Sequence, residues 1–192
     1  MTYNTLIFSI SIFALCSWLL QRIRFCFALS LLVVLLCNLP LILSLSITQW
    51  LDSLCGNPSL FLALLSLGSL LSLPKAPLAL HFFPSSTPLR LNIKSKIFIF
   101  VFGFILFWGN INYLWGFDPF NAGFYTQILI ALAVVILGYF IQPYLGVLLL
   151  LSCVGYLIKG GNIFSFMCDA LVWLYALLSL LLAPFVRKDR AK

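Results

Sequence analysis

The chain has 192 residues, of which 64% are hydrophobic and only 8% are charged, and its formal net charge is +7. A soluble domain carries about 25% charged residues, so this chain lacks the polar coat that water requires, and we expect lipid to be its solvent. The basic residues occur in short groups between apolar runs, which is typical of membrane topology signals and excludes a nucleic-acid-binding face.

The first two apolar runs cover residues 3–20 and 25–47. Arg22 and Arg24 follow the first run instead of preceding it, which is the reverse of a cleavable signal, so we expect that run to stay in the membrane. Asn38 in the second run is expected to bond a neighbouring helix, and Pro40 to kink its own helix. Residues 48–58 are then expected to form a loop without lysine or arginine.

The third run, residues 59–73, is short and contains the small residues Ala63, Ser66 and Gly68. Small residues let helix backbones approach closely in lipid, so this face is expected to be a helix contact. The loop 74–96 that follows contains four basic residues and four prolines. It is interpreted as a plain connector; the alternative is that its apolar centre dips into the lipid headgroups.

Four further runs complete the chain, at residues 97–115, 122–141, 144–158 and 162–185, separated by turns at Asp118-Pro119, Gln142-Pro143 and Lys159-Gly160-Gly161. Pro and Asp favour turns at these junctions. The predicted fold class is therefore an all-α polytopic membrane helix bundle of about seven transmembrane helices. We expect a single integral membrane domain that covers residues 1–192.

The distribution of basic residues predicts the orientation. The loop after the first run, the loop 74–96 and the carboxyl-terminal tail contain ten of the eleven basic residues, and Lys159 is alone opposite them. The positive-inside rule makes the first side cytoplasmic, with the N-terminus outside and the C-terminus inside. Termini on opposite sides need an odd number of spans. An alternative that also meets this condition has five spans plus a re-entrant hairpin at 122–161, with Gln142-Pro143 in mid-membrane. The short loops suit a multi-pass protein of the cell membrane, in particular a bacterial inner membrane.

The composition excludes several chemistries. There is no glutamate, and His81 is the single histidine. A bis-histidine haem, an HExxH zinc site and a proton relay of several carboxylates all need more of these residues. No catalytic, metal-binding or cofactor-binding residue is therefore predicted, and no cofactor. The six cysteines show no paired spacing; only Cys55 and Cys168 fall near one membrane face, as free thiols or as a disulfide.

One ionisable residue, Asp169, falls inside an apolar run, where a carboxylate by default suggests function. The functional interpretation is an outward-facing polar pocket with Asp169 as its charge and Asn110 and Gln127 as hydrogen-bonding partners. Trp108 and Trp115 would form its walls. Asp118 lies near the same face and would cap the following helix or pair with Lys159. The structural interpretation is that the amides join helices, that tryptophan and tyrosine mark the interface, and that Asp169 pairs with a backbone group or with Lys159.

Three functions are compatible with these features. The favoured hypothesis is a non-enzymatic accessory or assembly subunit that acts through helix–helix contacts, because catalytic groups are absent. The alternative is a small transporter or lipid-handling carrier that uses the pocket around Asp169. A membrane enzyme with Asp118 or Asp169 as its base is the least supported. The expected partners are membrane lipid and a membrane protein or a second copy of the chain.

Overall fold

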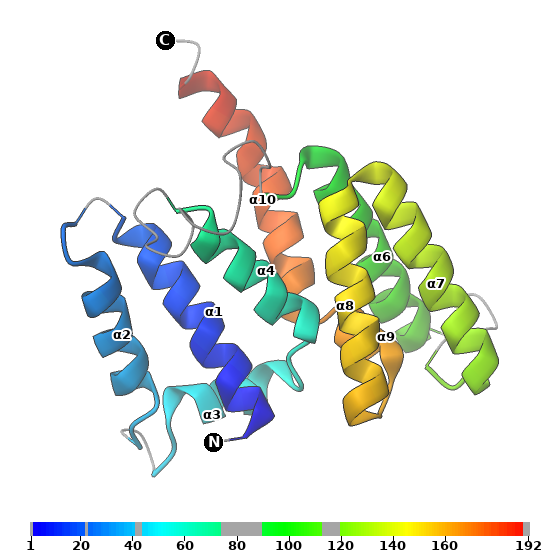
Figure 1. Cartoon of the computed structure of the whole chain (residues 1–192), viewed down its shortest axis with the longest axis horizontal. Helices are drawn as coiled ribbons and strands as arrows, with labels where there is room; N and C mark the ends of the chain where they lie inside the picture. Colours follow the sequence, from blue (N-terminus) through cyan, green and yellow to red (C-terminus); the bar gives the residue numbers. More distant parts are fainter. Residues whose placement is uncertain (1, 22, 41–43, 74–89, 113–119, 190–192) are drawn as a thin grey trace. The chain divides into compact units, whose positions relative to one another are not determined.

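The computed structural model of the chain describes residues 2–21, 23–40, 44–73, 90–112 and 120–189. Every regular element in these residues is an α-helix, which confirms the predicted all-helical class. The chain divides into two compact units, Met1–Arg90 and Leu91–Lys192. Each unit is described by itself below, and both are drawn in Figure 1.

The first unit contains α1 (Tyr3–Leu19), α2 (Cys26–Cys37), α3 (Ile47–Cys55) and α4 (Leu60–Leu71). Helix α1 lies between α2 and α4 (Figure 1) and contacts both. On the α4 side the hydroxyl of Ser66 bonds the hydroxyl of Ser11 in α1 at 3.3 Å, and Ala63 and Gly68 are buried. The small residues of α4 thus form a contact within the chain, as close packing of helices requires.

Two predictions for this unit are wrong. The run 25–47 is not one kinked helix, because α2 ends at Cys37 and Asn38 is its C-terminal cap. Pro40 lies beyond the end of α2, where it cannot continue the helix. The segment 48–58 is not simply a loop, because α3 begins at a capping box in which Ser46 and Gln49 bond each other's backbone N–H groups.

The second unit contains α6 (Ile93–Asn112), α7 (Phe124–Ile141), α8 (Pro143–Lys159), α9 (Ile163–Met167) and α10 (Ala170–Asp189). Helices α7 and α8 form an antiparallel hairpin, and α6 packs on α10. The hairpin turns within one residue, because Gln142 is extended (φ −159°, ψ 120°) and Pro143 supplies the preset φ of the first turn of α8. The predicted runs 97–115, 122–141 and 144–158 correspond to α6, α7 and α8.

The last predicted run, 162–185, is interrupted. The short helix α9 ends at Met167, Cys168 is extended (φ −152°, ψ 135°), and α10 begins at Ala170. Hydropathy does not reveal this break, because the residues on both sides of it are apolar. It depends on the side chain of Asp169, which is described below.

Among the described residues, one helix, α7, is long and apolar enough to cross a bilayer. A second group of helices is apolar but shorter: Tyr3–Leu19, Cys26–Cys37, Leu60–Leu71, Pro143–Lys159 and Ala170–Leu181. The expectation of about seven transmembrane helices is therefore not confirmed. What the structure establishes is an all-helical chain with one helix of spanning length and several shorter apolar helices.

Candidate functional site

Asp169, the predicted charge of the pocket, is 6% exposed and caps helix α10. Its Oδ1 accepts a hydrogen bond from the backbone N–H of Val172 at 2.7 Å, and its carbonyl accepts one from Trp173 at 3.0 Å. This is the N-cap arrangement, which satisfies an otherwise orphaned N–H group. The geometry therefore gives Asp169 a structural role.

Helix α6 packs tightly against the residues around this cap. The Trp173 indole donates from Nε1 to the carbonyl of Phe100 at 3.2 Å, and the two rings stack at 5.5 Å. A methyl group added at Gly103 would lie 2.6 Å from Trp173 Cδ1 and 3.1 Å from Cys168 Sγ. Only glycine fits this contact, so the side of the break that faces α6 is filled with packed side chains.

Gln127, a predicted hydrogen-bonding partner of Asp169, instead stabilises the turn before α7. Its Nε2 donates to the carbonyls of Phe120 at 2.9 Å and Ala122 at 3.1 Å. The same Phe120 carbonyl accepts from Nδ2 of Asn162 at 3.0 Å, and Oδ1 of Asn162 caps α9 by accepting from Phe164 N–H. Gln127 and Asn162 thus join the start of α7 to the start of α9.

The other predicted pocket residues cannot be placed around Asp169. Trp108 and Asn110 belong to α6, but their side chains lie outside what the structure describes, as do Trp115 and Asp118 altogether. Lys159, the predicted partner of an aspartate, has its ammonium group 5.9 Å from the centre of the Phe166 ring. Of the six predicted residues, Asp169 and Gln127 are therefore the two whose contacts are known.

A buried polar cluster in the first unit was only partly anticipated. Asn38 donates from Nδ2 to the Ser9 hydroxyl in α1 and to the Val34 carbonyl, both at 2.9 Å. Its Oδ1 accepts from the Thr48 hydroxyl of α3 at 3.1 Å, and Thr48 pairs with Ser46 at 2.9 Å. The expected bond of Asn38 to a neighbouring helix is present. The capping signal Ser46-x-x-Gln49 could have revealed the third helix in this cluster.

In the second unit, hydrogen bonds of Gln142 join the hairpin of α7 and α8 to the start of α6. Oε1 of Gln142 accepts from the backbone N–H of Asn92 at 3.0 Å and from the hydroxyl of Ser95 at 2.7 Å. Asn92 in turn caps α6, since its Oδ1 accepts from the N–H of Ser95 at 2.7 Å. The amino-terminal end of α6 and the hairpin turn therefore lie at the same level.

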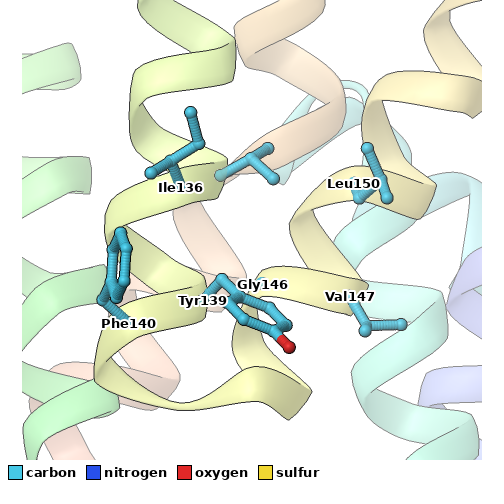
Figure 2. Close-up of a pocket in the computed structure, with 7 residues that line it drawn as sticks. Ile136, Tyr139, Phe140, Gly146, Val147 and Leu150 are labelled. Carbon is cyan, nitrogen blue, oxygen red and sulfur yellow. The ribbon is translucent and has the colours of Figure 1, made fainter.

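An open groove of about 260 Å³ lies between α7 and α8, with apolar side chains along its walls. Figure 2 shows Ile136 and Phe140 on the α7 side, Val147 and Leu150 on the α8 side, and the Tyr139 ring beside Gly146. The helices meet so closely at its floor that a methyl group on Gly146 would lie 2.5 Å from the Cβ of Tyr139. Such a groove offers shape and apolar contact but no catalytic group.

The described residues contain no group of three or more histidine, cysteine, aspartate or glutamate side chains that could hold a metal ion. All six cysteines, Cys55 and Cys168 among them, are free thiols. Comparison with models of protein families, with curated proteins and with solved structures finds no match for this chain. The function must therefore be argued from the residues themselves.

Proposed function

We propose that the chain is a multi-pass protein of the cell membrane whose function is contact with other membrane components, without catalysis. The first support is helix α7. Ala131, Val135 and Gly138 are its only buried residues, and they form one narrow stripe at helical spacing. The rest of its apolar surface, including Leu129 and Phe140, is exposed. A soluble protein would cover such a surface, whereas lipid does not require it to be covered.

The hydrogen bonds of Gln142 support an alternating path through the membrane. They join the end of α7 to the start of α6, so α6 and α7 run in opposite directions, as do α7 and α8. The exposed Lys94 lies one residue from Ser95 and therefore near the hairpin turn. By the positive-inside rule this end is cytoplasmic. A reporter that is active only outside the cell should stay silent when it is fused to the carboxyl terminus.

The same bonds argue against the re-entrant hairpin at 122–161. A re-entrant hairpin would hold Gln142 in mid-membrane. Its partners Asn92 and Ser95, and Lys94 between them, would then lie at the same depth. A lysine there costs about 2.5–3.5 kcal/mol on insertion scales. Labelling of Pro143→Cys with a membrane-impermeant thiol reagent tests this, with the wild-type chain and its six cysteines as the blank. Labelling in inverted vesicles supports two full spans, and absence of labelling from both sides supports the re-entrant form.

The main support for a contact function is that these polar side chains form hydrogen bonds within the chain itself. Asp169 and Gln127 bond helix ends within the chain, and Asn38 and Gln142 bond neighbouring helices. Polar groups engaged in this way are unavailable to a substrate, whereas apolar helix faces remain open to a partner. Purification in mild detergent tests the proposal. A protein that co-purifies in fixed proportion, or a defined homo-oligomer, supports an accessory or assembly subunit, whereas a monomer with a bound small molecule contradicts it.

The carrier remains the second candidate, and the break between α9 and α10 favours it. Interrupted helices with a charged residue at the break often line transport sites, and Asp169 occupies such a break. The substitution Asp169→Asn separates the two functions, because asparagine caps a helix as well as aspartate but has no charge. If Asp169→Asn is made at normal level and fails to complement a deletion strain, the carrier is supported. Full complementation supports the contact function.

A further inference from the structure

Helix α3 differs from the other described helices of the first unit because it is the shortest, it is amphipathic and it begins with a reciprocal capping box. It has nine residues, Ile47–Cys55, and its N-cap is Ser46, whose hydroxyl accepts from the N–H of Gln49 at 3.3 Å. Oε1 of Gln49 accepts from the N–H of Ser46 at 2.8 Å. At 1.5 Å per residue it is about 14 Å long, far too short to cross a bilayer of about 30 Å.

The surface of α3 has three distinct sides. Thr48 and Asp52, four residues apart, face the rest of the unit: Thr48 is fully buried, and Asp52 accepts from Asn4. Gln49 and Ser53, also four apart, form a polar side that is exposed. Residues three or four apart share a face of a helix. The polar side and the side that faces the unit are therefore separate.

The third side of α3 is apolar and partly exposed: Leu54 is exposed, and Ile47 and Trp50 are half-buried. It consists of Ile47, Trp50 and Leu54, which again lie three and four residues apart. Leu54 is 77% exposed and lies next to the exposed polar side chains of Gln49 and Ser53. An apolar environment favours exposed leucine, whereas water favours the polar side chains, so α3 suits a boundary between the two.

Hydrogen bonds hold α3 at the amino-terminal end of α1. Nδ2 of Asn4, in the first turn of α1, donates to Asp52 at 2.8 Å and to Asn57 at 2.9 Å. Helix α3 is thus held at the end of α1, and Figure 1 shows it running across that end and not alongside α1, α2 and α4. The end of a membrane-crossing helix is the level at which lipid headgroups meet water.

From this geometry we propose that α3 lies flat in the membrane interface at the amino-terminal end of α1, with Ile47 and Leu54 inserted among lipid acyl chains and Trp50 beside the lipid headgroups. Gln49 and Ser53 face water. The inference rests on the proposed membrane function and names a lipid-binding surface within it. Residues 44–60 contain no lysine or arginine, so the partner is a zwitterionic phospholipid that is held by apolar insertion, with Trp50 at the headgroup level.

The test compares two adjacent positions in the full chain, reconstituted into phosphatidylcholine vesicles. Leu54→Trp and Ser53→Trp are each made in a Trp50→Phe background, and the signal of that background is subtracted. Because an interfacial helix buries its apolar face about 5–10 Å, phosphatidylcholine brominated near the headgroup should quench Leu54→Trp at least about twice as strongly as Ser53→Trp. Aqueous iodide should show the reverse order.

Two controls keep the outcomes distinct. Leu137→Trp, on the exposed face of α7, should be quenched by deeply brominated lipid if the chain spans the membrane. Trp50 itself, measured as wild type minus Trp50→Phe, gives the same test of α3 without a new side chain.

Equal and weak lipid quenching at positions 53 and 54 with strong quenching at 137 overturns the interfacial position of α3. Protection of position 54 from both quenchers also overturns it, because protein would then cover this side. Failure of the chain to float with vesicles, or weak lipid quenching at 137, overturns the membrane function itself.

Discussion

Asp169 shows how one side chain can determine where a helix begins. Its carboxylate bonds the N–H of Val172 inside an apolar stretch, and the chain is extended immediately before it. A carboxylate in an apolar run suggests function by default, but a capping bond gives it a structural role that needs no ligand. Asn38 has a similar role, since it bonds α1, its own helix and α3.

We expect replacement of the cap at Asp169 to affect stability according to hydrogen-bonding ability and not charge. Asp169→Ala should lower the free energy of unfolding by about 1 kcal/mol, whereas Asp169→Asn should stay close to wild type, because asparagine caps as well as aspartate. Thermal unfolding in detergent measures both variants. An equal loss in both would mean that the charge, and not the cap, stabilises this break.

Asn38→Leu should destabilise the first unit by about 1–3 kcal/mol, because the buried Thr48 and Ser9 each lose their hydrogen bond to Asn38 and Thr48 keeps only its bond to Ser46. Ser53→Ala, at an exposed position of α3, is the matched control and should have little effect. Denaturant unfolding in detergent compares the two variants. Equal midpoints for Asn38→Leu and wild type would show that the cluster contributes no net stability.

At the scale of the element, the hairpin of α7 and α8 depends on close backbone contact. An added Cβ at Gly146 would lie 2.6 Å from the Cα and 2.8 Å from the backbone nitrogen of Tyr139. Neither atom can move without moving α7. The buried stripe of α7 also ends at Gly138, where a Cβ would lie 2.7 Å from Leu149. Small residues thus set the separation of the two helices.

We expect Gly146→Ser to destabilise the protein by about 1–3 kcal/mol, because overpacking forces the two helices apart. Gly123→Ser is the same substitution at a site with no atom within 4 Å, at the cap of α7 where serine is favourable. Thermal unfolding of both variants in the same detergent gives the comparison. A similar midpoint for the two variants would mean that the hairpin adapts to the added side chain.

Hydropathy predicted the helices whose limits are set by composition. The runs 122–141 and 144–158 match α7 (Phe124–Ile141) and α8 (Pro143–Lys159) closely, because Gln142-Pro143 interrupts the apolar pattern between them. It did not predict limits that single polar side chains set inside apolar sequence, such as the end of α2 at Asn38 and the start of α10 after Asp169. The candidate pocket was predicted from residue type, whereas the partners of Asp169 and Gln127 depend on local geometry that composition does not contain.

At the scale of the whole molecule, the two units are built in different ways. The first has a buried polar cluster that joins α1, α2 and α3, and its α2 and α4 have 12 residues each. The second has four helices of 17–20 residues, a length that α1 alone reaches among the described helices of the first, and its polar bonds lie mainly at helix ends and turns. Most helices of the first unit are therefore shorter than most helices of the second.

If the chain spans a bilayer as proposed, the length of these helices has a consequence for the membrane around it. Twelve residues at 1.5 Å per residue give about 18 Å, whereas a typical hydrocarbon core is about 30 Å thick. Hydrophobic mismatch of this size is relieved by local thinning of the bilayer, and it sorts proteins toward thinner membranes.

The thermal midpoint of the reconstituted protein should be higher in dimyristoyl than in dierucoyl phosphatidylcholine, because the shorter acyl chains of the first match the short helices better. The opposite order would mean that α2 and α4 do not span. With α2 and α4 spanning, the bilayer around the first unit is thinner than the bilayer around α7.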